Sequence, residues 1–266
     1  MDIFVINLTS SIKRREFQEK QLSSLKLDYQ IIHAMSTKDI GNNTYKKHYY
    51  DWQRPLKNTE VACYYSHKLT WHKIIKKNQP ALILEDDALL SKCVPKLLAD
   101  LSGKKGMDLV NLENRGRKKF ISKSSMALEC NSKLLRLYQD RTGAAGYILW
   151  PEGAKKLIQC EKRKGIALAD AHITACHSIR TYQVEPAPII QLDQCTYYGL
   201  SNTCSDEIST STINNCNNPK GSFSFRIKRA YFQLKLGLYQ FLLITKSDRR
   251  YIKTRKKDFF AINNTK

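Results

Sequence analysis

The chain has 266 residues, 42% of them hydrophobic, which is enough for one large α/β domain with a small appendage. No run of 18 apolar residues occurs, so a transmembrane helix is not expected. The formal net charge of +21 calls for a polyanionic neighbour, either a nucleic acid or an anionic membrane surface.

The N-terminus and the cysteines favour the cytoplasm. The opening MDIFVINLTSSIKRR places its basic residues after its apolar run, the reverse of the order in a secretory signal. All eight cysteines stand singly, without a C-x-x-C pair. A zinc site is therefore not expected, and free thiols in a reducing compartment are.

Strands and helices alternate along the first 200 residues. The first half predicts, in chain order, a strand at 3–8, a helix carrying Phe17, Leu22 and Leu25 inward, a strand at 29–34, a polar loop at 36–58, a helix at 60–77, a strand at 81–84, a helix at 94–101 and a strand at 107–112. The second half predicts a basic turn at 115–119, a glycine-containing loop and strand within 142–150, a helix from Pro151, a helix at 170–180 and strands near 181–184 and 187–191. This alternation indicates an α/β fold with a mostly parallel sheet flanked by helices, in which ligands bind beyond the carboxyl ends of the strands.

The composition changes after residue 200. Residues 201–220 are rich in serine, threonine and asparagine and predict a polar linker or mobile loop. Residues 221–266 contain twelve lysines and arginines but only two acids, with aromatic residues among them. We predict a domain at 1–200 and a basic helical tail at 221–266 that lies on an anionic membrane, packs on the domain or contributes to acceptor binding.

Three consecutive carboxylates follow one of the strands, in the stretch PALILEDDALL. Glu85, Asp86 and Asp87 repel one another at the end of a buried strand, so solvent, a helix N-terminus or a cation has to neutralise them. Alternate residues at a strand end can point to one side, and Mg²⁺ and Mn²⁺ prefer such oxygen ligands. We predict a metal site on Asp87 and Glu85; the alternative is a solvated strand end that caps the next helix.

The segments around this triplet form a wider pattern. The opening VINLTSSIKRREF, the helical TEVACYYSHKLTWHKII and the LEDD motif together resemble glycosyltransferase family 25, the lipopolysaccharide sugar transferases related to collagen galactosyltransferases. The matching residues are Asn7, Leu8, Arg14, Arg15, Glu60, Cys63, Ser66, His67, Leu84–Asp87, Gly143 or Gly146, Tyr147 and Leu168–Asp170. The resemblance covers roughly residues 1–195, and it departs from the family at Ala62, where glycine is usual, and at Ala167 or Leu168, where proline is usual.

The resemblance implies a GT-A-like, Rossmann-type fold, a UDP-sugar donor and inversion at the anomeric carbon. Bound Mn²⁺ (or Mg²⁺) would then stabilise the departing diphosphate. Residues expected at the nucleotide sugar are Asn7, Arg15, Glu60, Ser66, His67, Glu85, Asp86 and Gln191. Gln191 or Asp193 would replace the metal-binding histidine that many GT-A enzymes carry near the C-terminus, because no histidine follows His177.

Several of these residues also have purely structural interpretations. His67 could be a core histidine, the arginine pair a solvated helix face, and Glu60 a first-turn acid behind a Thr59 cap. Asp170 is the candidate general base that takes the proton from the acceptor hydroxyl, because a carboxylate at a helix start is held ionised. Its alternative is a helix cap, in which case His172 and Glu185 are the next candidates for the base.

Together these features predict a metal-dependent, inverting transferase that adds galactose, or next glucose, from a UDP-sugar to a bacterial lipooligosaccharide or lipopolysaccharide acceptor. The expected location is the cytoplasmic face of the inner membrane, where the protein would be peripheral and meet anionic lipid. A transferase acting on a protein or capsule acceptor is the alternative enzyme. A basic nucleic-acid-binding protein explains the charge but has no helix-turn-helix, zinc-finger or RNP signature, so no nucleic-acid partner is expected.

Overall fold

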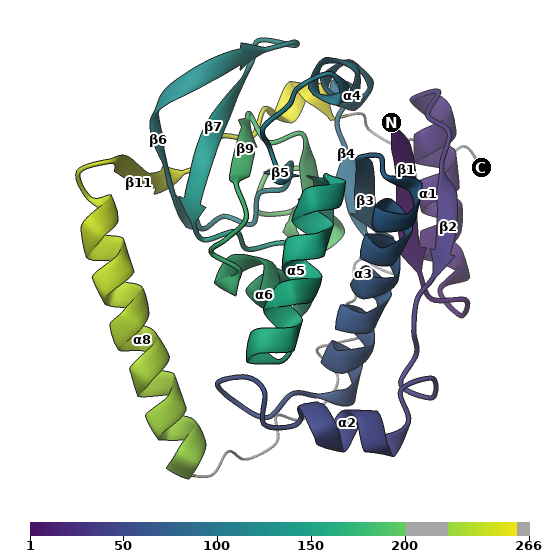
Figure 1. Ribbon diagram of the computed structural model, residues 1–266. Coiled ribbons are helices and arrows are strands. Elements are labelled where there is room, and N and C mark those ends of the chain that lie inside the picture. Colours follow the sequence, from purple (N-terminus) through teal and green to yellow (C-terminus); the bar gives the residue numbers. More distant parts are fainter. Residues whose placement is uncertain (201–222, 260–266) are drawn as a thin grey trace.

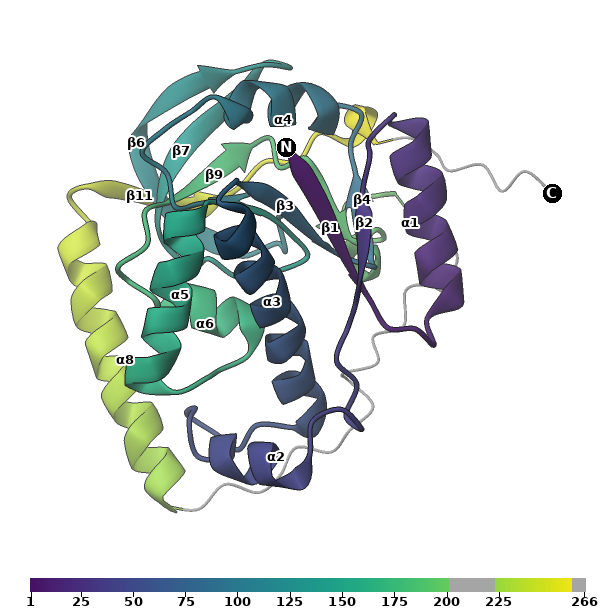
Figure 2. The same ribbon diagram turned by 45° about the vertical axis from the view of Figure 1, so that its right-hand side comes forward.

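The structure is a computed structural model of the chain, and it describes residues 1–200 and 223–259. The predicted linker at 201–220 lies outside the described residues. A nine-stranded sheet in the order β11-β6-β7-β9-β5-β8-β3-β1-β2 forms the centre, with helices on both faces (Figures 1 and 2). Its strands are β1 (Asp2–Asn7), β2 (Gln30–His33), β3 (Ala81–Glu85), β5 (Leu109–Asn111), β6 (Lys118–Leu128), β7 (Ser132–Gln139), β8 (Gly146–Leu149), β9 (Thr181–Glu185) and β11 (Ser247–Tyr251).

The helices cover the two faces of this sheet in separate groups. On one face α3 (Asn58–Lys77), α5 (Pro151–Lys164) and α6 (Ala169–Ala175) share a core cluster built around Trp71 and Tyr147. On the other face α1 (Ile12–Ser24) and α4 (Val94–Ser102) contribute to a second cluster of mostly leucine, valine and isoleucine. The remaining elements are α2 (Asn42–His48), α8 (Phe223–Leu243), the short η1 (Leu192–Gln194) and η3 (Lys256–Asp258), and the pair β4 (Ala88–Leu90) with β10 (Ile189–Gln191).

The predicted α/β fold is confirmed, and the strand directions refine it. β2, β1 and β3 run parallel to one another, as do β5 and β9. The pairings of β8 with β3 and β5, of β7 with β6 and β9, and of β11 with β6 are antiparallel. The sheet is therefore mixed rather than mostly parallel, and the carboxyl ends of β1 and β3 still meet at one edge.

Most predicted elements before residue 200 are present, but two expectations were wrong and one hairpin was missed. The loop at 36–58 contains α2, a polar helix without an apolar stripe, whose last turn carries three basic residues that favour a helix C-terminus. The helix expected at 170–180 ends at Ala175, where the Arg141 guanidinium donates hydrogen bonds to the carbonyls of Ile173 and Cys176. The β6–β7 hairpin was not predicted beyond a basic turn, because register shifts in β6 interrupt its alternation.

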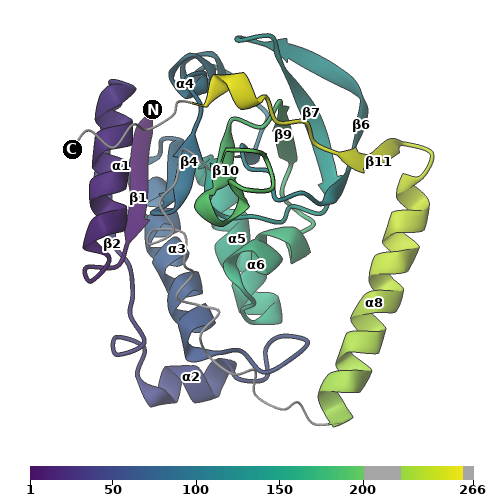
Figure 3. The same ribbon diagram turned by 180° about the vertical axis from the view of Figure 1, so that it is seen from behind.

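The predicted tail contributes to the main sheet as well as forming a helix. After α8, β11 pairs with β6 over residues 247–251, and Ile252 and Phe259 are buried against the domain. Seen from behind, α8 stands on the opposite side of the molecule from α1 (Figure 3). No helix among the described residues is long and apolar enough to cross a membrane, and the six cysteines that the structure describes are free thiols, as predicted.

Candidate active site

A cavity of about 470 Å³ lies at the carboxyl ends of β1 and β3. It is lined by the acidic triplet, by α3 and α6, by the loop before β8, and by residues after β5 and β10. Seven of the predicted site residues line it: Glu60, Ser66, His67, Glu85, Asp86, Asp170 and Gln191, with the predicted metal ligand Asp87 beside them. The structure therefore brings together residues that are more than 100 positions apart in the chain.

Each carboxylate of the triplet faces a different partner. Asp86 accepts hydrogen bonds from Asn7 Nδ2 at 2.8 Å and from Arg14 at 2.9 Å. Burial raises the pKa of Asp86, and the Arg14 and Asn7 contacts oppose that rise. Asn7 itself does not line the cavity, so its contribution in this structure is to hold the Asp86 carboxylate.

A chain of buried hydrogen bonds orients Glu85. Trp71 Nε1 donates to the Tyr147 hydroxyl, Tyr147 lies 2.9 Å from His67 Nδ1, and His67 Nε2 lies 3.0 Å from Glu85 Oε1. An ionised carboxylate only accepts hydrogen bonds, so His67 Nε2 carries the proton and Tyr147 donates to Nδ1. Burial is the largest single influence and would raise the pKa of Glu85, but the His67 hydrogen bond and the nearby positive charges, Arg115 and Arg14 among them, together outweigh it, so the net direction is down.

The same chain of hydrogen bonds yields a stability prediction. Tyr147→Phe removes the hydroxyl that joins Trp71 and His67 and leaves two fully buried polar groups unpaired. We expect the free energy of unfolding to fall by about 1–3 kcal/mol, measured by denaturant unfolding. Tyr50→Phe, at a side chain that is 63% exposed, is the control. Equal stabilities of the two variants would contradict the hydrogen-bond chain.

Asp87 lies beside Glu85 at the centre of the acidic group. Burial and then the Glu85 charge raise the pKa of Asp87 to about 7, although Arg14 lies 3.6 Å away. Gln191 Nε2 lies 3.2 Å from Glu85 and 3.4 Å from Asp87, while its buried Oε1 accepts no hydrogen bond from the described residues. With the Gln191 amide turned over, so that Oε1 replaces Nε2, two carboxylates and an amide oxygen would form a donor set that suits Mg²⁺ or Mn²⁺.

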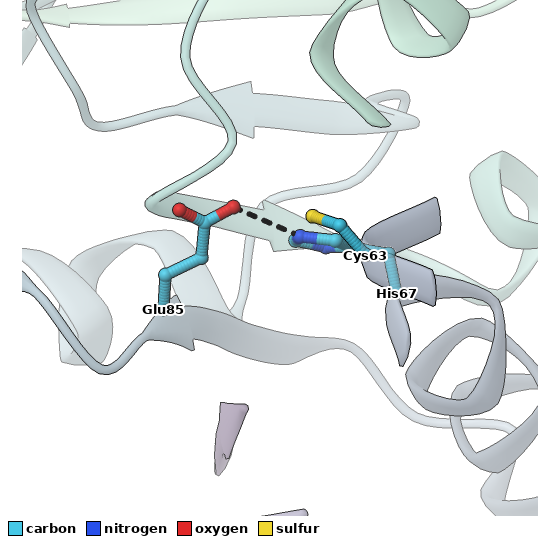
Figure 4. Close-up of side chains that lie close together, drawn as sticks. All are labelled: Cys63, His67 and Glu85. Atoms are coloured by element: carbon cyan, nitrogen blue, oxygen red, sulfur yellow. Dashed lines mark hydrogen bonds and ion pairs between the residues drawn. The ribbon is translucent and has the colours of Figure 1, made fainter. Parts of the chain in front are cut away.

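A second group that could hold a metal lies on the other side of Glu85. Cys63, His67 and Glu85 bring their ligand atoms within 4.8 Å of one another (Figure 4). Burial, and next the Glu85 charge, raise the pKa of the Cys63 thiol well above its usual range, so it stays protonated. His67 Nε2 is occupied by its hydrogen bond to Glu85. The Glu85–Asp87 side of the cavity is therefore the better fit for a cation.

Two buried glutamines of α1 hold the backbone that leaves the triplet. Gln18 donates to the carbonyls of Asp86 and Ala88, and Gln21 donates to Ala88 and accepts from the Leu90 amide. Together they pair three backbone groups on the buried side of the turn into β4. The acidic triplet therefore stands on a fixed backbone rather than on a solvated loop.

The arginine that reaches the cavity is Arg14 and not Arg15. Arg14 lines the cavity and pairs with Asp86, whereas the half-exposed Arg15 side chain pairs with Glu19. Helical spacing could have identified it, because residues 14, 18 and 21 share the face that turns inward while 15 and 19 share the outer one. Arg115, which pairs with Asp193 at 2.8 Å, is a second cavity arginine that the sequence analysis did not select.

Replacing the two arginines separately tests this assignment. Arg14→Gln should lower kcat/KM by about tenfold to a thousandfold, because it removes the cation that faces Asp86 and Asp87. Arg15→Gln should leave kcat/KM near the wild-type value. Steady-state kinetics with the donor varied would measure both, and a larger loss for Arg15→Gln would reverse the assignment.

Glu60 and Ser66 have structural partners at the cavity wall. Glu60 accepts two hydrogen bonds from Arg54 and one from the Lys57 backbone amide, so it is α3's first-turn acid, while Lys57 rather than Thr59 occupies the cap position. Ser66 Oγ accepts from the Met35 amide at 2.8 Å. Both residues fix segments that border the cavity, and their predicted contact with a nucleotide sugar stays a prediction.

Asp170 lies at the cavity, and its two rivals as the general base do not. It is the second residue of α6, after Leu168 at the cap position, and its Oδ1 accepts a hydrogen bond from the Ala171 amide. His172 is buried, stacks on Trp71 and hydrogen-bonds the Leu157 carbonyl. Glu185 pairs with Arg250 of β11. Asp170 is therefore not the N-cap residue itself, although it accepts a first-turn amide; its role as the base stays a prediction, and the rivals face elsewhere.

The arrangement as a whole is that of an α/β enzyme whose cavity carries an acidic triplet and two arginines and opens at the carboxyl ends of parallel strands. The model of glycosyltransferase family 25 (LPS biosynthesis protein) matches residues 1–172, and the chain belongs to this family of glycosyltransferases.

Individual relatives agree with the family assignment. The chain is 29% identical to the lipooligosaccharide biosynthesis protein lic2B of Haemophilus influenzae over 72% of this chain and 76% of that protein. It is 27% identical to a putative glycosyltransferase of the same species, over 62% and 60% of the two chains. Procollagen galactosyltransferase 1-A of Xenopus laevis is 28% identical over 60% of this chain, which spans only 28% of that longer protein.

Proposed function

We propose that the protein is an inverting glycosyltransferase that moves a hexose, galactose first and glucose second, from a UDP-sugar to a bacterial lipooligosaccharide or lipopolysaccharide acceptor. The observation that carries the proposal is the cavity in which Glu85 and Asp87 meet Gln191, with Arg14 and Arg115 beside them, in a chain of this family. The similarity to the lipooligosaccharide biosynthesis protein lic2B supports the acceptor class.

Different residues of the cavity would have different roles in the reaction. Glu85 and Asp87, with Gln191 Oε1, would hold Mn²⁺ or Mg²⁺, which when bound supplies Lewis-acid stabilisation of the diphosphate. Arg14 and Arg115 add positive charge where negative charge develops on the leaving group. The chain Trp71–Tyr147–His67 keeps Glu85 in one orientation, so the carboxylate does not have to reorganise during the reaction.

Asp170, which lines the cavity from α6, would act as the general base. Its carboxylate accepts the proton of an acceptor hydroxyl as that oxygen bonds to the anomeric carbon. The bond from the anomeric carbon to the β-phosphate oxygen breaks on the other side, which inverts the configuration and releases UDP. Because α6 lines the cavity separately from the triplet after β3, the base and the groups that stabilise the diphosphate could lie on different sides of the sugar.

We also propose that the protein works as a peripheral protein on the cytoplasmic face of the inner membrane. A lipid-linked acceptor is available there, and the net charge of +21 suits anionic lipid. A protein acceptor is the second candidate, favoured by the similarity to procollagen galactosyltransferase. Transfer assays with saccharide and peptide acceptors in parallel separate the two.

The donor can be tested without knowing the acceptor. Thermal unfolding is measured with a panel of UDP-sugars, each with and without Mn²⁺, since a ligand that binds only the folded state raises the apparent melting temperature. We expect UDP-galactose or UDP-glucose to raise it more with Mn²⁺ than without, together with slow Mn²⁺-dependent hydrolysis. Stabilisation by no UDP-sugar in either condition would contradict the proposed donor.

A further inference from the structure

Helix α8 packs on the domain with only one of its faces. Phe225 stacks on Tyr50 with ring centroids 5.4 Å apart, Phe232 lies against Trp52, and Tyr239 lies against His177. Lys228 donates to the backbone carbonyls of Tyr50 and Asp51, and Leu243 is buried. These contacts fix which way the helix faces, and they occupy the positions i, i+3, i+7, i+14 and i+18 from Phe225.

The opposite face of α8 is a continuous apolar stripe. Each of its residues lies three or four positions from another member, so they share one side of the helix. Each is between 58% and 73% exposed: Phe223, Ile227, Tyr231, Leu234, Leu238, Phe241 and Leu242. Scattered apolar residues are normal on a protein surface, but a contiguous stripe of this kind marks an interaction surface. In Figures 1 and 3 this helix forms the outer edge of the molecule.

The charges on the helix identify the partner. At 100° per residue, Arg226 and Arg229 lie on one side of the stripe and Lys235 on the other, and α8 contains no aspartate or glutamate. A second copy docking through this stripe would bring basic flanks together, which is unfavourable. An anionic bilayer offers hydrocarbon to the stripe and phosphate to the flanks at once.

We propose that the outer face of α8, defined by the seven stripe residues, docks the protein on an anionic membrane surface. The 21-residue helix is about 31 Å long and would lie in the plane of the interface, because its inner face is already packed on the domain. This surface deepens the proposed membrane location and rests on it, while the donor chemistry is independent of it.

Vesicle binding by the full chain tests the surface. The double variant Leu234→Asp/Leu238→Asp should bind vesicles of phosphatidylglycerol and phosphatidylcholine at least about tenfold more weakly than the wild type, since each side chain loses its insertion into the interface. The control Leu69→Asp/Met126→Asp has the same change of charge at exposed apolar residues of α3 and β6 and should bind as the wild type does. Deleting the whole tail would be uninformative because it also removes β11.

Two further measurements decide between the remaining explanations. Mn²⁺-dependent UDP-sugar hydrolysis should be unchanged in the stripe variant; if it is lost, Leu234→Gln/Leu238→Gln replaces that variant. Equal vesicle binding by the stripe and control variants would overturn the proposal, and so would a wild type that ignores anionic vesicles. A dimer in sedimentation that the stripe variant abolishes, without vesicle binding, would assign the face to a second copy. Hydrolysis without vesicle binding overturns only this surface, whereas vesicle binding without donor turnover overturns only the proposed reaction.

Discussion

Replacing Asp87 by alanine is expected to reduce sugar transfer at least a hundredfold, measured in saturating Mn²⁺ with the donor identified by thermal shift. Asp87 lies beside Glu85 and 3.6 Å from Arg14, so its loss would remove a proposed metal ligand and change the charge of the proposed leaving-group site. The control is Asp28→Ala, at an exposed acid away from the cavity, which should keep wild-type activity. More than a tenth of wild-type activity in the Asp87 variant would remove Asp87 from the metal site.

The stability of the same variant has a distinct pH dependence. Burial and Glu85 raise the pKa of Asp87 from 3.8 to about 7 in the folded protein. The folded state therefore holds a proton that the unfolded state has lost between pH 4 and 7, and without metal this group lowers stability as the pH rises through that window. Asp87→Ala lacks this dependence. We expect the difference in melting temperature, Asp87→Ala minus wild type, to be more positive at pH 8 than at pH 4. The fold of the variant should stay intact.

The site could be predicted from sequence where local pattern and function coincide. The acidic triplet follows a short apolar strand, and the S-H helix precedes it by a fixed distance, so both appear in the order in which the fold uses them. The choice between Arg14 and Arg15 depended instead on the rotation of α1, which Gln18 and Gln21 set by their hydrogen bonds to the turn after Asp87. Apolar periodicity alone does not report glutamines that are buried to hold a backbone.

Other parts of the site depended on strand pairings that no local pattern contains. Gly143 lines the cavity, and its φ of +92° and its close approach to the fully buried Glu113 leave no room for a side chain. Arg115 reaches the cavity because β5 lies between β8 and β9, an arrangement that includes an antiparallel strand inserted between parallel ones. Likewise, β11 closes the far edge of the sheet only after α8 and the segment outside the described residues.

Asp170→Asn is expected to lower the transfer rate by roughly 10²–10⁴, the usual contribution of a general base, with donor binding nearly unchanged. The amide keeps the size of the carboxylate and can still accept a hydrogen bond from Ala171, but it cannot take the acceptor's proton. The change also removes a negative charge from the first turn of α6, which costs about 0.3–1 kcal/mol. Single-turnover rates and donor affinity by thermal shift measure the two quantities separately.

The first turn of another helix provides the matched control. Glu152 occupies the first turn of α5 and is exposed. Glu152→Gln therefore removes the same charge at the corresponding place in another helix, without touching the cavity. If Asp170 acts only through the helix, the two variants should lose similar stability and neither should lose rate. If Asp170 takes the proton, only its variant slows, and the loss appears in kcat rather than in donor affinity because the proposed diphosphate contacts are with the triplet that follows β3 and with α1. A slow Asp170→Asn variant with weakened donor binding would instead assign Asp170 to the donor side of the cavity. The general base would then be neither His172 nor Glu185, because Leu157 and Arg250 hold those two side chains.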